Sequence, residues 1–296
     1  MQEPWTVKSL LEWTTGYFRR KNIAEPRLEA ELLLAYVLGI DRVGLYVNYY
    51  QPVNQDERSC YREIIKRRVQ GEPVAYLTGK KEFFSLEFDV SPEVLIPRAE
   101  TEVMVEKAIA IGRGMGGSLW VADVGTGCGA IAIALAVYLP NARIVAIDIS
   151  SAAVELARKN ARRYQVHDRI DFMVGDLLTP LGQDNAGLDI VVANLPYVPT
   201  NEWENLALEV KEFEPRIALD GGADGLAYYR RLMPQARQCL REGGYILVEI
   251  AWNQGPAMLS LMQHFFDEVE VGQDLAGRDR VVVGRKGAES PANQVL

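Results

Sequence analysis

The sequence predicts an α/β protein in which an N-terminal helical domain precedes an open, doubly wound sheet. Three observations support this fold class. At 296 residues, the chain exceeds the roughly 100–200 residues of a typical domain, so two domains are expected. Apolar residues recur at helical spacing in the first 80 residues, as at Leu28, Leu32 and Ala35. From residue 119 onward, short apolar runs alternate with helical patterns and end in Gly, Asp or Asn, which indicates buried parallel strands.

Composition narrows the class of protein further. The 48% hydrophobic and 24% charged content is typical of a soluble globular protein, and no apolar run approaches the roughly 20 residues of a membrane span. The start, Met1–Trp5, has no basic region followed by an apolar core, so we expect a cytoplasmic protein. Three scattered cysteines and two histidines predict neither a metal site nor histidine general-base chemistry. The net charge of -8 argues against a whole-surface nucleic-acid binder.

Charge separates the N-terminal domain, residues 1–80, from the rest. These residues carry 12 Lys and Arg against 10 Asp and Glu, a net charge of +2, while the other 216 carry 20 against 30, a net charge of -10. A helical pattern spans about 61–69, and Thr6 and Asp56 are placed where helix caps are useful. The basic cluster at residues 66–68 is interpreted as a solvated helix face, with a docking patch as the alternative.

A change of period marks a linker at residues 81–97. Apolar residues alternate with polar ones from Phe84 to Val90, and Ser91-Pro92 is expected to turn the chain before 94–97. We therefore expect a β-hairpin between the domains. The second domain is expected to span 98–286, with residues 287–296 as a disordered tail. Its first helix should run from about 101 to 111 and be closed by the Gly-rich segment 112–117.

The segment 124–131 predicts a cofactor site. It lies between an expected strand, Leu119–Asp123, and an expected helix at 130–137. Glycines at alternate positions, Gly125, Gly127 and Gly129, let the backbone approach a ligand at the N-terminus of that helix. The spacing is G-x-G-x-G and no G-K-[ST] follows, so a nucleotide-like cofactor is favoured over a dinucleotide or a triphosphate.

The next strands are expected to end at the same ligand-binding edge. A strand at 143–147 ends in Asp148, about 20 residues beyond the glycines, where a carboxylate can accept both hydroxyls of a ribose. Capping of the helix that begins near Ser151 is the alternative role, which suits Ser150 better than Asp148. A strand at 170–174 ends in Gly-Asp-Leu, and a strand at 190–193 ends in Asn194. A helix at 226–240 closed by Gly243-Gly244, a strand at 245–250, and an antiparallel pair at 268–271 and 280–284 complete the domain.

The stretch from Asn194 to Tyr197 has the chemistry of a site for a planar nitrogen group. Asn194 offers an acceptor and an NH2 donor, Pro196 fixes its own backbone angle, and Tyr197 supplies a flat face. These groups fit a glutamine side-chain amide or the amino group of adenine. From these residues alone, an ordinary strand followed by a Pro-rich turn is the alternative.

In this order, the motifs resemble those of class I S-adenosylmethionine-dependent methyltransferases. The whole chain resembles one family in particular, the HemK/PrmC release factor glutamine methyltransferases. Besides the glycine loop and Asn194–Tyr197, the resemblance rests on residues 71–79, 82–83, 97–102, 214–222 and 277–281. It implies a doubly wound, seven-stranded Rossmann-like methyltransferase sheet with an N-terminal helical domain and a β-hairpin linker.

The resemblance also implies an activity. A methyl group would pass from S-adenosyl-L-methionine to the side-chain amide nitrogen of the Gln in the Gly-Gly-Gln motif of class 1 peptide-chain release factors, modulating translation termination. The N-terminal domain would dock this protein substrate, and the enzyme would be a monomer without stable nucleic-acid binding. The implied cofactor-binding residues are Gly125, Thr126, Gly127, Cys128, Gly129, Asp148, Asp176, Leu177 and Asn194.

The implied catalytic residues are Asn194, Leu195, Pro196 and Tyr197. The side-chain oxygen of Asn194 and the backbone carbonyl of Leu195 would accept the two amide protons, while Tyr197 packs against the amide plane. The proton can leave after methyl transfer, so no strong base is needed beforehand.

Two residues depart from the family pattern. Leu195 stands where the family usually has Pro, and Cys128 where it more often has Ser. Asn-Leu-Pro-Tyr is similar to the motif of ribosomal RNA dimethyladenosine transferases, so a nucleic-acid adenine methyltransferase acting on rRNA or DNA is the alternative function. Those enzymes differ in their glycine loop and lack the 214–222 block. A cofactor-binding module without catalysis is a third possibility, which the intact Asn194, Pro196 and Tyr197 disfavour.

Overall fold

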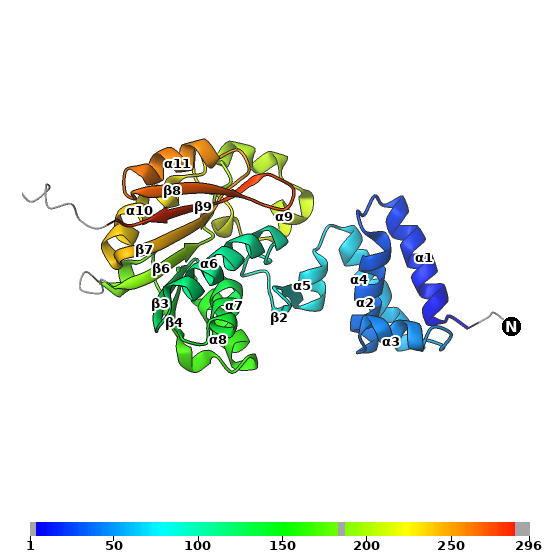
Figure 1. Ribbon diagram of the computed structural model, residues 1–296. Helices are drawn as coiled ribbons and strands as arrows, with labels where there is room; N and C mark the ends of the chain where they lie inside the picture. Colours follow the sequence, from blue (N-terminus) through cyan, green and yellow to red (C-terminus); the bar gives the residue numbers. More distant parts are fainter. Residues whose placement is uncertain (1–3, 183–186, 288–296) are drawn as a thin grey trace, which may run out of the picture. The chain divides into compact units, whose positions relative to one another are not determined.

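The computed structural model describes residues 4–182 and 187–287 (Figure 1). The chain divides into two compact units. One unit is Met1–Lys80 together with Ala207–Phe213, and the other is Lys81–Leu206 together with Glu214–Leu296. Residues 207–213, which we expected inside the second domain, therefore group with the first unit. The tail expected at 287–296 lies outside the described residues, apart from Gly287.

The first unit consists of helices around one apolar core. They are α1 (Val7–Arg20), α2 (Pro26–Leu38), α3 (Arg42–Val47), α4 (Gln55–Val69), α5 (Val74–Thr78) and α9 (Leu208–Phe213). Thr6 caps α1 as predicted, because its side chain accepts from the Ser9 N–H at 3.2 Å. The prediction that Asp56 caps a helix is wrong, because the N-cap of α4 is Asn54. Asn54 has the extended backbone of a cap and exchanges hydrogen bonds with Glu57, whereas Asp56 lies in the first turn.

The basic cluster at residues 66–68 does not behave as one surface. Lys66 and Arg67 are exposed and pair with nearby Glu63 and Glu72, as on a solvated helix face. Arg68 is instead buried, with its guanidinium bonded to both carboxylate oxygens of Glu29 at 2.6 and 3.1 Å. Its Nη2 also lies 3.0 Å from a carboxylate oxygen of Glu209 in α9, so this arginine ties α2, α4 and α9 together.

The β-hairpin is present, but its turn is not where the alternation placed it. Strands β1 (Lys80–Phe83) and β2 (Leu86–Asp89) are joined at Phe84 and Ser85, whose φ angles are 51° and 59°. The Phe84 N–H donates to Glu102 Oε1 at 2.7 Å, and the Phe84 ring meets the edge of Tyr138. These tertiary contacts hold a turn that its side chains do not favour. Residues 94–97 consequently form no strand.

The second unit contains the predicted seven-stranded sheet, in the order β5-β4-β3-β6-β7-β9-β8. The strands are β3 (Leu119–Val124), β4 (Ala142–Asp148), β5 (Ile170–Val174), β6 (Leu188–Ala193), β7 (Leu240–Glu249), β8 (Glu268–Gln273) and β9 (Asp279–Arg285). Strands β3 to β7 are parallel, and β9 runs antiparallel to both of its neighbours. The strand order reverses between β3 and β6, which places a ligand crevice at the carboxyl ends of these strands.

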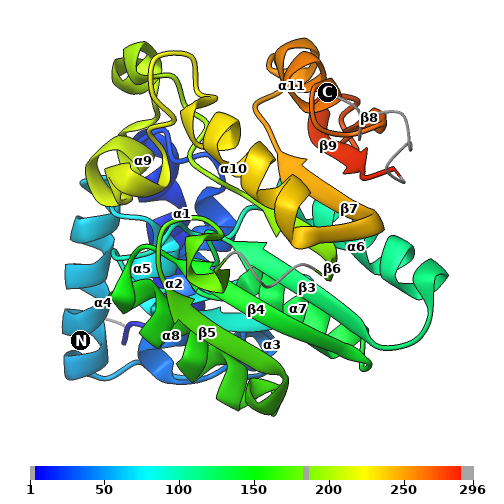
Figure 2. The same ribbon diagram turned by 90° about the vertical axis from the view of Figure 1, so that its left-hand side faces the viewer.

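Helices cover both faces of this sheet (Figure 2). One face carries α6 (Glu102–Met115), α7 (Ala130–Tyr138) and α8 (Ser151–Arg163), and the other carries α10 (Ala227–Cys239) and α11 (Gly255–Gln263). Alternate residues of β3, β4, β6 and β7 pack with Leu232 and Met258 in one buried cluster beneath α10 and α11. Within the described ranges, no helix has the length and apolar character needed to cross a bilayer.

Two glycine segments differ from their predicted roles. Helix α6 does not end at Gly112 but continues to Met115, and Gly112 is buried in it. A Cβ at Gly112 would lie 2.9 Å from Leu139 and 3.0 Å from Leu119, so this glycine allows close packing rather than ending the helix. Helix α10 ends at Cys239, and Gly243 and Gly244 lie inside β7. Short connections η1 (Ala99–Thr101), η2 (His167–Arg169), η3 (Thr179–Leu181), η4 (Thr200–Asn205) and η5 (Arg216–Ala218) complete the fold.

Candidate active site

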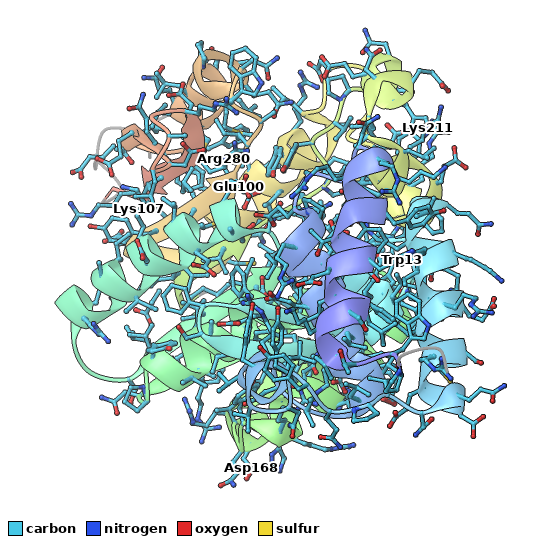
Figure 3. All side chains as sticks on the ribbon, turned by 90° about the vertical axis from the view of Figure 1, so that its right-hand side faces the viewer. Trp13, Glu100, Lys107, Asp168, Lys211 and Arg280 are labelled. Atoms are coloured by element: carbon cyan, nitrogen blue, oxygen red, sulfur yellow. The ribbon has the colours of Figure 1, made fainter. Side chains whose placement is uncertain are left out.

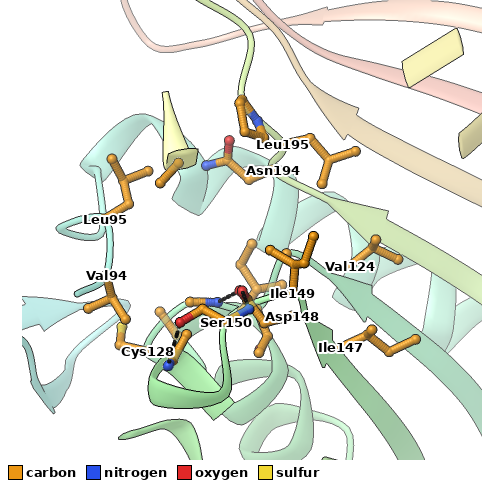
Figure 4. Close-up of a pocket in the computed structure, with 18 of the residues that line it drawn as sticks. Val94, Leu95, Val124, Cys128, Ile147, Asp148, Ile149, Ser150, Asn194 and Leu195 are labelled. Atoms are coloured by element: carbon orange, nitrogen blue, oxygen red, sulfur yellow. Dashed lines mark hydrogen bonds between the residues drawn. The ribbon is translucent and has the colours of Figure 1, made fainter. Parts of the chain in front are cut away.

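A cavity opens at the carboxyl ends of β3, β4, β5 and β6, where the parallel sheet predicts a ligand site. It encloses about 1080 Å³ of space, part of it open to solvent. Figure 4 shows Asn194 and Leu195 on one side of it, Asp148 and Ser150 on another, and Val94 and Leu95 closing a third. Most predicted site residues line this cavity, namely Gly125, Thr126, Gly127, Cys128, Asp148, Asp176, Leu177, Asn194, Leu195 and Pro196. Gly129 and Tyr197 do not.

The three loop glycines have different physical roles. All three have positive φ angles, of 78°, 55° and 84°. A Cβ at Gly125 would lie 3.0 Å from Leu195, and one at Gly129 would lie 3.0 Å from both Ala157 and Ile133. Gly127 has nothing within 4 Å of its Cβ position. Gly125 and Gly129 therefore serve protein packing, whereas Gly127 leaves room for a ligand against the backbone.

Asp123, near the end of β3, forms hydrogen bonds to the glycine loop and to the first turn of α7. Its Oδ2 accepts from the Thr126 hydroxyl at 2.7 Å and from the Ala132 N–H at 3.1 Å. Burial raises the pKa of Asp123 to about 7, and its Oδ1 has no partner among the described residues. From its sequence context we expected Asp123 to be only the last residue of a strand. Its position directly before Val-Gly-Thr-Gly was the available signal. Thr126, predicted to bind cofactor, already uses its hydroxyl on Asp123 and its N–H on the Ile147 carbonyl at 3.0 Å.

Asp148 is presented to the cavity by the end of β4. Its Oδ2 accepts from the Gly127 N–H and its Oδ1 from the Ser150 N–H, both at 2.9 Å. Burial raises the pKa of Asp148, and these N–H donors oppose the shift by stabilising the carboxylate. A carboxylate oxygen has two acceptor positions, so both oxygens can still receive a further hydroxyl. Ser150, and not Asp148, caps α8 by accepting from the Ala153 N–H at 3.3 Å.

An apolar wall follows Asp148. Ile149 lines the cavity and is 55% exposed, which gives a planar group an aliphatic surface to rest on. We did not predict this residue from the sequence, although its place directly after Asp148 was a usable signal. Leu177, which also lines the cavity, has a φ of 52°, a conformation that is uncommon outside glycine and concentrates at functional sites. Asp176 forms an ion pair with Arg231 at the rim.

Asn194 leaves β6 at its carboxyl end and faces the cavity. Its Nδ2 donates to the Thr101 hydroxyl at 3.2 Å. No residue in the described ranges donates to its Oδ1, which is therefore available to a ligand. The Leu195 N–H donates to the Tyr229 hydroxyl at 3.2 Å, and that hydroxyl donates to the Glu249 carbonyl at 2.5 Å. These bonds fix the backbone at Leu195, whose carbonyl oxygen also lies 3.4 Å from the Tyr229 hydroxyl and keeps a second acceptor position.

Tyr197 is tied into the core in this structure. Its hydroxyl donates to Glu249 Oε1 at 3.3 Å, and its carbonyl accepts from Gln254 Nε2 at 2.9 Å. Burial raises the pKa of Tyr197, so the phenol is neutral. The predicted packing of its ring on a substrate amide stays a prediction, because Tyr197 is not among the residues that line the cavity.

The block at residues 214–222 packs against Asn194–Tyr197, which we call the acceptor segment, and its continuation at Val198. A Cβ at Gly221 would come within 2.6 Å of the Pro196 carbonyl oxygen. The Gly221 N–H donates to the Val198 carbonyl at 2.8 Å. At the start of the block, buried Glu214 accepts from the Ile96 N–H at 3.1 Å and pairs with Arg98. Two family-specific segments, 97–102 and 214–222, thus meet beside the acceptor segment.

Comparison with known proteins identifies the family. The PrmC N-terminal domain matches residues 9–79, and a methyltransferase domain matches residues 121–213. The release factor glutamine methyltransferase of Geobacter sulfurreducens is 44% identical over 286 residues, which cover 96% of this chain and 98% of that relative. The chain belongs to the release factor glutamine methyltransferase family. The family member from Chlorobaculum tepidum is 40% identical over 285 residues, 94% of this chain and 97% of its own length.

The fold comparison is consistent with this family. The catalytic domain of hMettl16, solved with an RNA hairpin of the MAT2A 3'UTR, superimposes with a TM-score of 0.55 at 15% identity, covering 74% of this chain and 84% of that one. At this identity the likeness shows the methyltransferase fold alone. The expected family, fold class and S-adenosylmethionine dependence are confirmed.

Both departures from the family pattern are accommodated by burial. Cys128 is 2% exposed, and burial raises the pKa of its thiol to about 12, so it is a neutral side chain of serine size. Its carbonyl accepts from Asn160 Nδ2 at 2.9 Å. The Leu195 side chain is 5% exposed and packs in the core cluster beneath α10. Cys128 lines the cavity with a neutral thiol, and Leu195 has no polar side-chain group.

Proposed function

We propose that this methyltransferase modifies the side-chain amide nitrogen of the Gln in the Gly-Gly-Gln motif of class 1 peptide-chain release factors. The supporting observation is the free Asn194 Oδ1 at the cavity, next to the Leu195 carbonyl. The relatives' names supply the class of protein substrate. Gly127, Asp148, Ile149 and Leu177 would hold S-adenosylmethionine, which supplies an electrophilic methyl group.

The residues at the cavity fit this cofactor. Gly127 leaves its Cβ position open, and the Asp148 carboxylate can accept ribose hydroxyls through its remaining acceptor positions. Ile149 offers an exposed apolar surface for the adenine ring. Asp176 also lines the cavity and forms an ion pair with Arg231. Its carboxylate has further acceptor positions, which would accept a hydrogen bond from the adenine amino group.

Catalysis in this proposal depends mainly on placement. An amide nitrogen shares its lone pair with its carbonyl, so it is a poor nucleophile until it is held in line with the methyl group. Asn194 Oδ1 and the Leu195 carbonyl would accept its two protons. Both oxygens would then face the positive charge that develops on nitrogen during attack. The proton can leave after transfer, and neither acceptor has to act as a strong base.

The decisive experiment is mass spectrometry of an intact class 1 release factor after incubation with the protein and labelled S-adenosylmethionine. We expect one methyl group on the Gln of the Gly-Gly-Gln peptide. Labelling of ribosomal RNA or DNA adenine, with none of the factor, would replace this proposal with the alternative function.

A pair of variants tests the two proposed hydrogen-bond acceptors, Asn194 Oδ1 and the Leu195 carbonyl. Asn194→Ala should lower turnover by on the order of a hundredfold, because it removes an acceptor needed most in the transition state. Leu195→Pro keeps the backbone carbonyl but loses the N–H bonded to Tyr229, so it should cost only about 0.5–1.5 kcal/mol of stability and change turnover modestly. Asn141→Ala, on the exposed turn before β4, is the control. Near-normal turnover of Asn194→Ala would remove Asn194 from the mechanism.

The proposed substrate also suggests where the enzyme works. Translation termination is cytoplasmic, so we propose a cytoplasmic enzyme that acts as a monomer and binds no nucleic acid stably, in keeping with its net charge of -8. Light scattering after size-exclusion chromatography, with and without RNA, tests the last two statements. A dimer or a comigrating RNA complex would contradict them.

A further inference from the structure

A buried glutamine joins three segments at the end of the acceptor segment. Gln254, the residue before α11, is 6% exposed. Its Nε2 donates to the Tyr197 carbonyl at 2.9 Å and lies 3.4 Å from the Asp224 carbonyl. Its Oε1 accepts from the Ala251 N–H at 3.0 Å. One side chain therefore links the turn after β7, the loop before α10 and the acceptor segment.

The direction of these hydrogen bonds is fixed by the backbone. A peptide N–H can only donate, and a peptide carbonyl can only accept. The oxygen of the Gln254 amide must therefore face Ala251, and its NH2 group must face Tyr197. A reversed amide would set donor against donor and acceptor against acceptor. Neither backbone partner titrates, so the polarity of the contact is the same at every pH.

The neighbouring loop makes room for this amide with a glycine. Gly225 has a φ of 76°, in the left-handed region that favours glycine. A Cβ at Gly225 would overlap both Gln254 Nε2 and the Tyr197 carbonyl oxygen. The loop before α10 can therefore approach the contact between Gln254 and Tyr197 only without a side chain at this position.

The segment 277–281, on which the family resemblance partly rests, anchors the turn that contains Gln254. The Ile250 N–H donates to the Arg280 carbonyl at 2.9 Å. The guanidinium of Arg280, which Figure 3 labels, donates in return to the Ile250 carbonyl at 3.2 Å. At the other end of the turn, a Cβ at Gly255 would overlap the Asp279 carboxylate. Strand β9 therefore contacts both ends of the turn and fixes the place from which Gln254 reaches Tyr197.

Gln254 completes the hydrogen bonding of one peptide unit at the end of the acceptor segment. The carbonyl of this unit belongs to Tyr197 and accepts from Gln254. Its N–H belongs to Val198 and donates to the Leu219 carbonyl at 2.9 Å. A peptide unit is planar, so holding both of its polar groups fixes its orientation. Without Gln254, only the N–H of this unit would be held.

We propose that Gln254 is a positioning residue that holds the peptide unit after Tyr197 and so keeps the Leu195 carbonyl aligned with the methyl acceptor. Pro196 lies between these two points, and its ring locks φ, so a rotation at Tyr197 is transmitted to Leu195. The inference rests on the proposed function, because it takes the Leu195 carbonyl as an acceptor of an amide proton. Gln254 is not among the residues that line the cavity, so its effect on the reaction is indirect.

The test is Gln254→Glu, which preserves size and the oxygen that accepts from Ala251 but replaces the NH2 group with a titratable oxygen. When protonated, the new carboxyl can still donate to the Tyr197 carbonyl, and burial favours this form. When ionised, it sets a negative charge against the Tyr197 and Asp224 carbonyls. We expect kcat to stay within about threefold of the wild type at pH 6 and to fall roughly 10- to 100-fold below it by pH 9, as for other supporting-residue and misplacement effects.

The readout is the kcat of the variant divided by that of the wild type at each pH. The charged groups near Gln254 are common to both enzymes, so the ratio removes their own titration. They are Asp224 with its partner Arg230, Glu249 beside the Tyr197 hydroxyl, and Asp279 and Arg280 of β9. The KM for S-adenosylmethionine should stay near that of the wild type, because Gln254 lies outside the cavity lining.

Two further variants separate positioning from a general effect of the substitution. Gln263→Glu makes the same change at the exposed last residue of α11 and should give a ratio near one at every pH. Gln254→Met has a similar length but no donor, so its ratio should be low at every pH without a slope. A purely structural role would lower the melting temperature and the fraction of protein that binds S-adenosylmethionine, while the kcat of each binding-competent molecule stayed normal.

Two results would overturn the inference. One is a Gln254→Glu ratio that does not change between pH 6 and 9. The other is a loss explained fully by a smaller fraction of protein that binds S-adenosylmethionine, measured by calorimetry. Should Gln254→Met fail to fold, the pH series of Gln254→Glu decides alone. Failure of the proposed function would look different, since the wild type itself would then leave the release factor unmodified.

Discussion

Asp148 binds two backbone N–H groups through its two carboxylate oxygens, so it shapes the glycine loop as well as facing the cavity. Asp148→Ala should weaken S-adenosylmethionine binding, because the ribose would lose charge-assisted hydrogen bonds worth roughly 1.5–3 kcal/mol. Isothermal titration calorimetry measures this loss. Asp168→Ala, at a side chain 87% exposed on η2, is the control and should bind normally. Unchanged affinity of Asp148→Ala would exclude Asp148 from the cofactor site.

Asp123 and Glu249 make stability depend on pH near neutrality. Burial raises the pKa of each side chain to about 7, well above the ordinary carboxyl range in an unfolded chain. The folded state then binds more protons than the unfolded state between about pH 4 and 7, so the free energy of unfolding should fall as pH rises through this window. Urea titrations at pH 5.5 and 8 should show higher stability at the lower pH. Glu249→Gln should reduce that difference, and an increase in stability toward pH 8 would contradict the assignment.

At the scale of elements, the loop containing Gly221 determines the position of the acceptor segment. A Cβ at Gly221 would lie 2.6 Å from the Pro196 carbonyl oxygen, and the φ of this residue is not positive, so the effect is steric rather than conformational. Gly221→Ala should displace residues 196–197 and lower turnover by about a hundredfold, the cost of an ångström-scale misplacement. Single-turnover methylation of the release factor measures it.

Gly114→Ala is the matched control for this prediction. Gly114 lies within α6, and nothing is within 4 Å of its Cβ position. Alanine there should stabilise the helix by roughly 0.5–1 kcal/mol and leave turnover unchanged. If both variants behaved alike, close packing at Gly221 would not explain the loss.

At the scale of the whole molecule, the two units should contribute to different kinetic parameters. The first unit exposes apolar side chains at and after α3, with Val47 79% and Tyr50 74% exposed. If this unit docks the release factor away from its Gln loop, Val47→Glu should raise the KM for the intact factor but not for a short Gly-Gly-Gln peptide. Leu275→Glu, at an exposed apolar residue of the second unit, should affect neither. Equal effects of Val47→Glu on both substrates would contradict a docking role.

Full-length variants suit this question better than removal of residues 1–80. Helix α9 belongs to the first unit, where Leu208 and Phe213 approach Gly71 and Glu209 pairs with Arg68. A truncated chain would lose these partners and expose the apolar side of α9. Reduced activity of such a chain would therefore mix lost docking with a disturbed loop.

The sequence by itself determined the elements whose residues form local patterns. Short apolar runs predicted the parallel strands, while the family resemblance implied the seven-stranded sheet. The glycines after β3 and the acid at the end of β4 marked the expected cofactor edge, because backbone conformation and strand burial depend on nearby residues. Most predicted cofactor and acceptor residues line one cavity.

Tertiary structure decided what depends on residues distant in the chain. The hairpin turn at Phe84 relies on Glu102 and Tyr138, and α9 groups with helices more than a hundred residues earlier. The orientation of the Asn194 side chain depends on the hydroxyl of Thr101, which lies in a separate motif. Hydrogen-bond direction is a property of a completed network, so the pattern around Asn194 alone could predict an amide-binding site but not which end of its side chain faces the substrate.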